Sequence, residues 1–150
     1  MPSLLALSAV HQHLIAARKR LQTALVVESG EPREVMHFAL LIGYGANAVN
    51  PYLAFAAVQD MVDTGRIKMD ADTAESNYLK AVDKGLLKIM SKMGIATIRS
   101  YRGSRLFDAI GIDSAVAERY FGNTSSAVGG VGLDGIASCL LYTSDAADDK

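Results

Sequence analysis

The chain has 150 residues, half of them hydrophobic and 21% charged, which is the composition of a globular domain rather than of a disordered segment. Its formal net charge of -1 argues against an overall field that attracts nucleic acid or an anionic membrane. The single cysteine, Cys139, excludes an internal disulfide framework and suits a reducing compartment. No apolar run approaches the roughly 20 residues of a membrane span. We therefore expect a soluble cytoplasmic protein with neither nucleic acid nor membrane among its partners.

The first 65 residues alternate between helical and strand patterns. Apolar residues recur at intervals of three and four after Ser3, and the basic run "ARKR" suits the C-terminal end of a helix. "TALVVE" is short and β-branched, as a buried parallel strand should be, while Pro32 and Pro51 suit the first turns of helices. The pattern predicts helices over residues 3–20, 32–42 and 51–65, with strands over 23–28 and 46–50. Such βα units form parallel sheets.

The second half begins after a polar stretch, residues 64–72, where we expect a domain boundary. Asp72 and Glu75 resemble a capping box for a long helix over 73–92, and Gly94 suits the left-handed position after it. Beyond it we expect a strand over residues 95–101, short helices over 104–111 and 114–121, and a glycine-rich loop over 125–132. The fold class is therefore α/β, mostly helical with short parallel strands.

The stretch "GYGANA" fits G-x-G-x-x-[GA] through Gly43, Gly45 and Ala48. A dinucleotide-binding loop of this kind follows a strand and opens a helix, whose N-terminal amides meet the pyrophosphate. Here a helical pattern precedes the glycines and a strand pattern follows them. The order favours a helix C-cap and a tight turn.

Basic residues gather between Tyr78 and Arg105. Four lysines repeat at every fourth position, which disfavours a helix slightly unless water or an anion lies against them. Three arginines follow beside glycines, where a phosphate or carboxylate ligand and a solvated surface are both open interpretations. The two sets are Lys80, Lys84, Lys88 and Lys92, and Arg99, Arg102 and Arg105. His11 and His13 are two positions apart and would point to different sides of a helix, so they do not predict a metal site, and His37 stands alone.

The strings "LVVESGEPREVMHFALLIGYGANAVNPYLAF" and "NYLKAVDKGLLKIMSKMGIATIRSYRGSRLFDAIGI" resemble the large (alpha) subunit of glutamate synthase, and the likeness continues through "YFGNTSSAVGGVGLDGIA". The resemblance implies partial (β/α) barrel-type segments from two adjacent domains. Residues 1–68 would end the family's central domain, and residues 69–138 would begin its FMN-binding synthase domain. Residues 139–150 do not fit the pattern, and we expect them to be a non-native tail.

The resemblance also implies a function. The family transfers glutamine-derived ammonia to 2-oxoglutarate and reduces the product to glutamate with FMN. Electrons arrive through an iron–sulfur cluster from a small NAD(P)H-oxidising subunit or from ferredoxin. The cysteines that hold the cluster would lie outside this chain, so we expect the fragment alone to be inactive. On the same grounds we expect Ser91, Met93, Gly94 and Thr97 to face the flavin and Ser100, Arg102 and Gly103 to face the substrate.

Several positions depart from the family pattern. Arg99 stands where glutamine is expected, Ser104-Arg105 where Ala-Gln is expected, and Ala96 where serine is expected. Ala127 replaces an arginine before the Gly129-Gly130 pair, which puts anion binding by that loop in doubt, and Met36 replaces a histidine. The alternative to an enzyme fragment is a stand-alone, non-enzymatic α/β module with a role in assembly or regulation.

Overall fold

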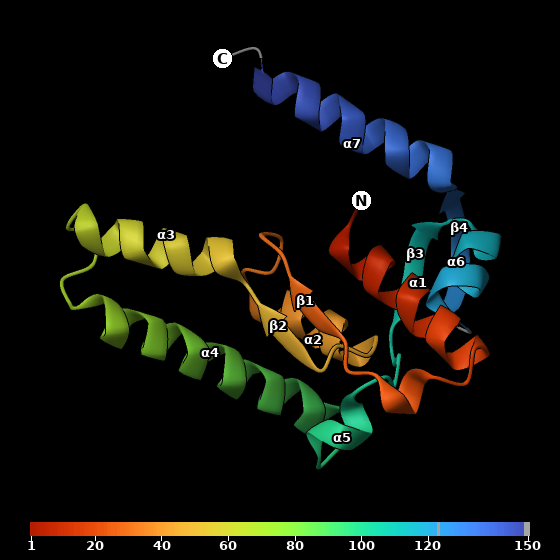
Figure 1. Cartoon of the computed structure of the whole chain (residues 1–150), viewed down its shortest axis with the longest axis horizontal. Helices are drawn as coiled ribbons and strands as arrows, with labels where there is room; N and C mark the ends of the chain where they lie inside the picture. The colour runs from red at the N-terminus through yellow and green to blue at the C-terminus, as the bar shows by residue number, and fades with distance from the viewer. Residues whose placement is uncertain (123, 149–150) are drawn as a thin grey trace.

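The computed structural model describes residues 1–122 and 124–148, with side chains up to residue 141. Two small parallel sheets, each of two strands, are surrounded by helices (Figure 1). The elements of the first half are α1 (Ser3–Ala16), a 3-10 turn η1 (Arg20–Gln22), β1 (Val26–Glu28), α2 (Val35–Gly43), β2 (Ala48–Asn50) and α3 (Tyr52–Asp63). Those of the second half are α4 (Ala71–Lys92), α5 (Ile98–Tyr101), β3 (Asp108–Ile112), α6 (Ser114–Phe121), β4 (Ser125–Val131) and α7 (Leu133–Asp148).

The first half confirms the predicted βα order. Strands β1 and β2 pair in parallel with Val27 opposite Val49, and α2 makes the crossover between them. Helix α1 ends at Ala16 rather than near residue 20, because Arg18 takes a left-handed φ of 56° that an α-helix cannot continue through. Helix α2 begins at Val35, later than the position of Pro32 predicted.

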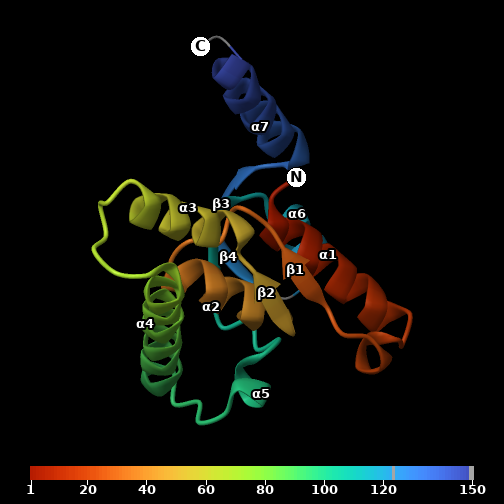
Figure 2. The same ribbon diagram turned by 60° about the vertical axis from the view of Figure 1, so that its left-hand side comes forward.

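Helix α4 lies against both α2 and α3, and Figure 2 shows it beside α2. Its N-cap is Asp70, whose side chain accepts from the Thr73 amide at 2.9 Å, so the predicted capping box at Asp72 is wrong. Tyr78 on α4 packs edge-on against Phe38 and Phe55 and donates its hydroxyl to the Arg33 carbonyl. Gly94 has the expected positive φ of 71° after the helix. Packing of α4 thus extends across the boundary predicted at residue 68, and the division into two domains stays a prediction.

Three of the expected elements after α4 are wrong. The predicted strand over residues 95–101 is instead a loop followed by the helical turn α5, since the Thr97 hydroxyl accepts from the Ser100 amide and caps that turn. The helix expected over 104–111 is replaced by strand β3, and the glycine-rich loop over 125–132 is strand β4. A Cβ at Gly130 would overlap the backbone of Gly111, so these glycines allow the two strands to approach closely. The helix expected over 114–121 is confirmed as α6.

Two apolar clusters hold these elements together. The first joins α1, α2 and α6 through Leu5, Leu41 and Phe121, and the second joins α2, α4 and α5 through Ala39, Met90 and Tyr101. The Tyr101 ring is fully buried, and its hydroxyl donates to the Ala39 carbonyl at 2.9 Å. Phe107 packs against both clusters, so it links the N-terminal unit to the chain beyond α4.

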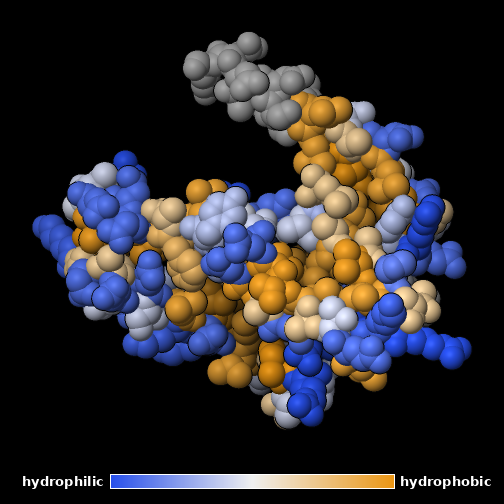
Figure 3. Space-filling model, viewed as in Figure 1, coloured by the Kyte–Doolittle hydropathy of each residue, from blue (hydrophilic) through white to orange (hydrophobic). Residues whose placement is uncertain are grey.

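The C-terminal helix α7 extends away from the body in both ribbon views. Its first turns, with Met1 and Leu5, border an apolar hollow of about 410 Å³, and hydrophobic residues gather there in Figure 3. Cys139 is exposed on this helix. The tail that we predicted to be non-native begins at Cys139, and its last two residues lie outside the described part of the chain. Among the described residues, no helix is long and apolar enough to cross a membrane.

Replacing Gly85 by alanine tests the packing of α4 on α2. In an exposed helix interior this change stabilises a protein by about 1 kcal/mol. Here the added methyl would overlap the two γ-methyl groups of Val35, so we expect Gly85→Ala to lower the free energy of unfolding by about 1–3 kcal/mol. Urea unfolding measures it, and a Val35→Ala/Gly85→Ala double variant should recover most of the loss. An increase in stability for Gly85→Ala alone would contradict this packing.

Candidate functional site

The glycine turn after α2 is the meeting point of three segments that are distant in sequence. Its backbone carbonyls at Ile42 and Gly43 accept hydrogen bonds from the amides of Gly103 and Arg105, both at 3.1 Å. Gly45 has a φ of +114°, and a Cβ there would overlap the His11 ring. Helix α2 precedes the turn and strand β2 follows it, so the prediction of a helix end and tight turn is confirmed, with Tyr44 rather than Gly43 as the C-cap.

Arg20 lies beside this turn and is held by four acceptors. Its Nε donates to His11 Nδ1 at 2.8 Å, and Nη1 donates to the Thr23 carbonyl at 2.6 Å. Its Nη2 donates to the Gly45 carbonyl at 2.7 Å and to Asn47 Oδ1 at 3.2 Å. All four acceptors are neutral, so the guanidinium is fixed in position while its charge stays uncompensated.

His11 is buried, with 8% of its surface exposed. Burial, followed by the nearby charges of Arg20 and Arg105, lowers its pKa from 6.5 to about 4. The ring is therefore neutral near pH 7. Because Nδ1 accepts from Arg20, the proton sits on Nε2, which makes that nitrogen a donor. A Cβ at Gly103 would lie 3.7 Å from His11 Cε1, so this edge of the ring faces the loop after α5.

A cleft of about 430 Å³ opens at this point, lined by His11, Arg20, Leu21, Gly45, Arg99 and Arg102. Of the predicted substrate residues, Arg102 lines the cleft and Gly103 borders it, while the Ser100 hydroxyl is hydrogen-bonded to Thr97. Sequence reasoning missed Arg20 and set His11 aside. The basic run containing Arg20 was interpreted only as the end of a helix, and no local pattern pairs it with residues about 80 positions away.

The predicted flavin residues lie before α5, at the end of α4 and in the connection that follows it. Ser91 and Gly94 line a second hollow of about 370 Å³, together with Leu87, Met90, Ile95 and Ala96. Met93 packs into the cluster around Tyr101, and Thr97 caps α5, so neither lines this hollow. Of the seven predicted residues, Ser91 and Gly94 line one hollow, Arg102 lines the other with Gly103 at its border, and Met93, Thr97 and Ser100 line neither.

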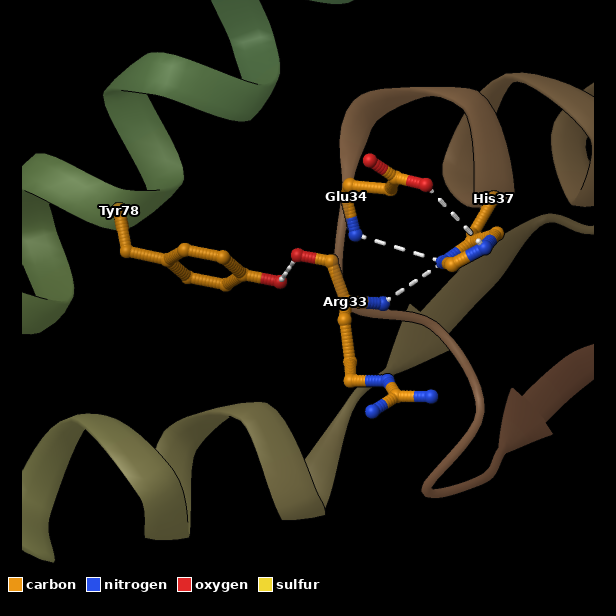
Figure 4. Close-up of polar contacts among 4 residues, drawn as sticks. All are labelled: Arg33, Glu34, His37 and Tyr78. Atoms are coloured by element: carbon orange, nitrogen blue, oxygen red, sulfur yellow. Dashed lines mark hydrogen bonds and ion pairs between the residues drawn. The ribbon is translucent and has the colours of Figure 1, made fainter.

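The remaining candidates have structural explanations. The four lysines of α4 are exposed, which agrees with a solvated helix face. His37 accepts at Nδ1 from the Arg33 and Glu34 amides and lies 3.6 Å from a Glu34 carboxylate oxygen, at the start of α2 (Figure 4). Within the described residues, no group of three or more histidine, cysteine or acidic side chains could hold a metal ion.

The His11 environment predicts a pH-dependent stability. Between pH 6.5 and about 4 the unfolded chain binds a proton at His11 that the folded chain does not, so stability falls as pH is lowered through this range. We expect the free energy of unfolding, measured in urea at about pH 7.5 and about pH 5.5, to fall in the native chain and less in a His11→Asn variant. A His13→Gln control should keep the native slope, because His13 is exposed. An unchanged slope in His11→Asn would contradict the prediction.

Comparison with known proteins shows which family the chain resembles. Residues 1–113 match the family model of the glutamate synthase central domain, which extends past the boundary predicted at residue 68. The chain is 52% identical over 137 residues to the NADPH glutamate synthase large chain of Bacillus subtilis, covering 91% of this chain and 9% of that protein. It is 43% identical over 143 residues to the NADH glutamate synthase of Saccharomyces cerevisiae, covering 90% of this chain and 7% of that one. Ferredoxin-dependent glutamate synthase 2 of Synechocystis is 42% identical over 151 residues, with 94% and 10% covered.

These matches span nearly the whole chain, whereas the chain spans about a tenth of the length of these relatives. The matched region, residues 1–113, includes the glycine turn and the loop after α5 that is hydrogen-bonded to it. The chain belongs to the glutamate synthase family.

Proposed function

We propose that this chain is a segment of a glutamate synthase large subunit that transfers glutamine-derived ammonia to 2-oxoglutarate and reduces the product to glutamate. The observation that carries the proposal is identity of 42–52% over 90% or more of the chain to three glutamate synthases. Their names give NADPH, NADH and ferredoxin as electron donors, so the similarity favours none of the three. Either a small NAD(P)H-oxidising subunit or ferredoxin would serve as partner.

The hollow at the end of α4 suits one part of a flavin. Its side chains are apolar except for the Ser91 hydroxyl, backbone polar groups contribute much of the remaining surface, and no charged side chain lines it. Such a surface fits the flat ring system of FMN and offers no cation to its phosphate. We therefore assign Ser91 and Gly94 to the ring and expect the phosphate contacts to come from other parts of the subunit. When bound and reduced by the electron donor, FMN would supply the hydride for the reduction.

The other predicted residues would support this site indirectly. Met93 packs against the cluster around Tyr101, and Thr97 caps α5. Both would therefore hold the segment that carries Ser91 and Gly94 in position rather than contact the flavin. Arg102 offers a guanidinium that can hold a carboxylate of 2-oxoglutarate through paired hydrogen bonds. Ser100 and Gly103 flank it, and the Gly103 amide anchors this loop to Ile42.

An iron–sulfur cluster would be held outside this chain. A cluster needs several cysteine thiolates, and the sequence contains one cysteine, Cys139. This chain therefore has no role in holding the cluster in the proposed function.

A chimera tests the proposal directly. Residues 3–137 of this chain would replace the aligned segment of the Bacillus subtilis large chain, and glutamate formation from glutamine and 2-oxoglutarate would be assayed. We expect an active, flavin-containing chimera in which Arg102→Gln lowers kcat/KM for 2-oxoglutarate at least about tenfold, because a charge-assisted hydrogen bond is lost.

The matched control is Lys84→Gln, which removes a cation from the exposed face of α4 and should leave kcat/KM within about twofold. A soluble chimera that retains flavin but forms no glutamate would count against the proposed function. Equal losses in Arg102→Gln and Lys84→Gln would remove Arg102 from the substrate site.

The chain on its own should form no glutamate. In the part of the chain that the structure describes, the two sheets have two strands each, and this open arrangement does not enclose a flavin. We expect the purified chain to show neither flavin absorbance after dialysis against FMN nor glutamate formation with a chemical reductant. Glutamate formation by the isolated chain would contradict this expectation.

A further inference from the structure

The cleft beside the glycine turn collects cations from separate elements. Arg20 belongs to η1 and Arg99 to α5, and Arg102 is the C-cap residue of α5. The charge of Arg102 lowers the pKa of Arg20, after the larger effect of burial, so the two guanidinium groups act on each other. Figure 3 shows hydrophilic residues gathered over α5, at the lower edge of the view.

No carboxylate compensates this charge within the described part of the chain. The cleft has no acidic lining residue, and the one close contact between a basic and an acidic side chain among the described residues joins His37 and Glu34 at the start of α2. Like charges held close together destabilise a fold unless solvent or an anion screens them. The cleft is therefore electrostatically suited to a negatively charged occupant.

The donors in the cleft combine a fixed group with free ones. Arg20 is locked by its four acceptors, so it supplies a preorganised positive charge at the wall. Arg99 and Arg102 make no side-chain hydrogen bond or ion pair with another described residue, so their N–H groups can be given to a ligand. The His11 Nε2–H edge adds a neutral donor facing Gly103.

We propose that this cleft binds a small molecule carrying two oxyanionic groups, carboxylate or phosphate, with Arg99 and Arg102 as its movable ligands and Arg20 as the fixed charge behind them. The volume of about 430 Å³ is within the range of small-molecule sites. Two separated cations plus a fixed third favour a dianion over a monoanion, and the open mouth makes binding sensitive to salt. The site uses Arg20, Arg99 and His11, so it extends beyond the proposed contact of Arg102 with the substrate.

Calorimetric titration of the chain at low ionic strength tests this, with sodium pyrophosphate and sodium 2-oxoglutarate as separate probes that each carry two oxyanionic groups. We expect saturable binding of at least one probe with a dissociation constant of about 1 mM or lower. Arg99→Gln and Arg102→Gln should each weaken it about tenfold, because each removes a charged donor. Arg66→Gln, in the loop between α3 and α4, removes the same charge from an exposed position elsewhere and should leave affinity unchanged.

Histidine NMR signals give a local readout of the same binding. The His11 ring signals should shift on titration while those of exposed His13 do not, in a chain whose helical circular dichroism is unchanged. Pyrophosphate binding without 2-oxoglutarate binding would assign a ligand with two phosphate groups, and the reverse would assign a dicarboxylate.

Absence of binding by both probes would overturn the proposal, as would equal weakening in Arg66→Gln. Binding of an acidic peptide alone would also overturn it and indicate a protein surface instead. The direct binding assay needs no catalytic activity, so its failure is distinguishable from failure of the chimera.

Discussion

The carbonyl groups at the C-terminal end of α2 are the constraint on which the arrangement depends. A helix leaves its last carbonyls without partners inside the helix, and each must find a donor elsewhere. Here Ile42 and Gly43 receive the amides of the loop after α5, while Gly45 receives the Arg20 side chain. One helix end therefore fixes the positions of segments from both halves of the chain.

This arrangement also decides the charge state of the cleft. His11 can accept from Arg20 because its ring is neutral, and burial keeps that histidine neutral. A carboxylate in place of one of the neutral acceptors would cancel the guanidinium charge. Satisfying Arg20 with carbonyl, imidazole and amide groups instead leaves a full positive charge at the wall of the cleft.

Local sequence patterns predicted the parts of the fold that rest on local physics. Helices α2, α3, α4 and α6 follow from apolar periodicity, and β1 and β2 from short apolar runs between turn residues. The pattern failed where a distant partner decides the conformation. Gly130 belongs to a strand because it meets the backbone of Gly111. Residues 98–101 form a helical turn because Thr97 caps them, although Ile95 and Ile98 favour a strand.

The candidate site, like the fold, was predictable only where neighbouring residues in the sequence form it. Arg99 and Arg102 stood out as free cations near glycines, whereas Arg20 and His11 join them only through the folding of η1 and α1 onto the turn. Two arginines at positions where the family resemblance implies neutral side chains, Arg99 and Arg105, both act on this region. Arg105 lowers the pKa of His11 and donates to the Gly122 carbonyl, and a Cβ at Gly122 would overlap its guanidinium. Arg105 thus places a further positive charge near His11 at a position where the family pattern implies a neutral side chain.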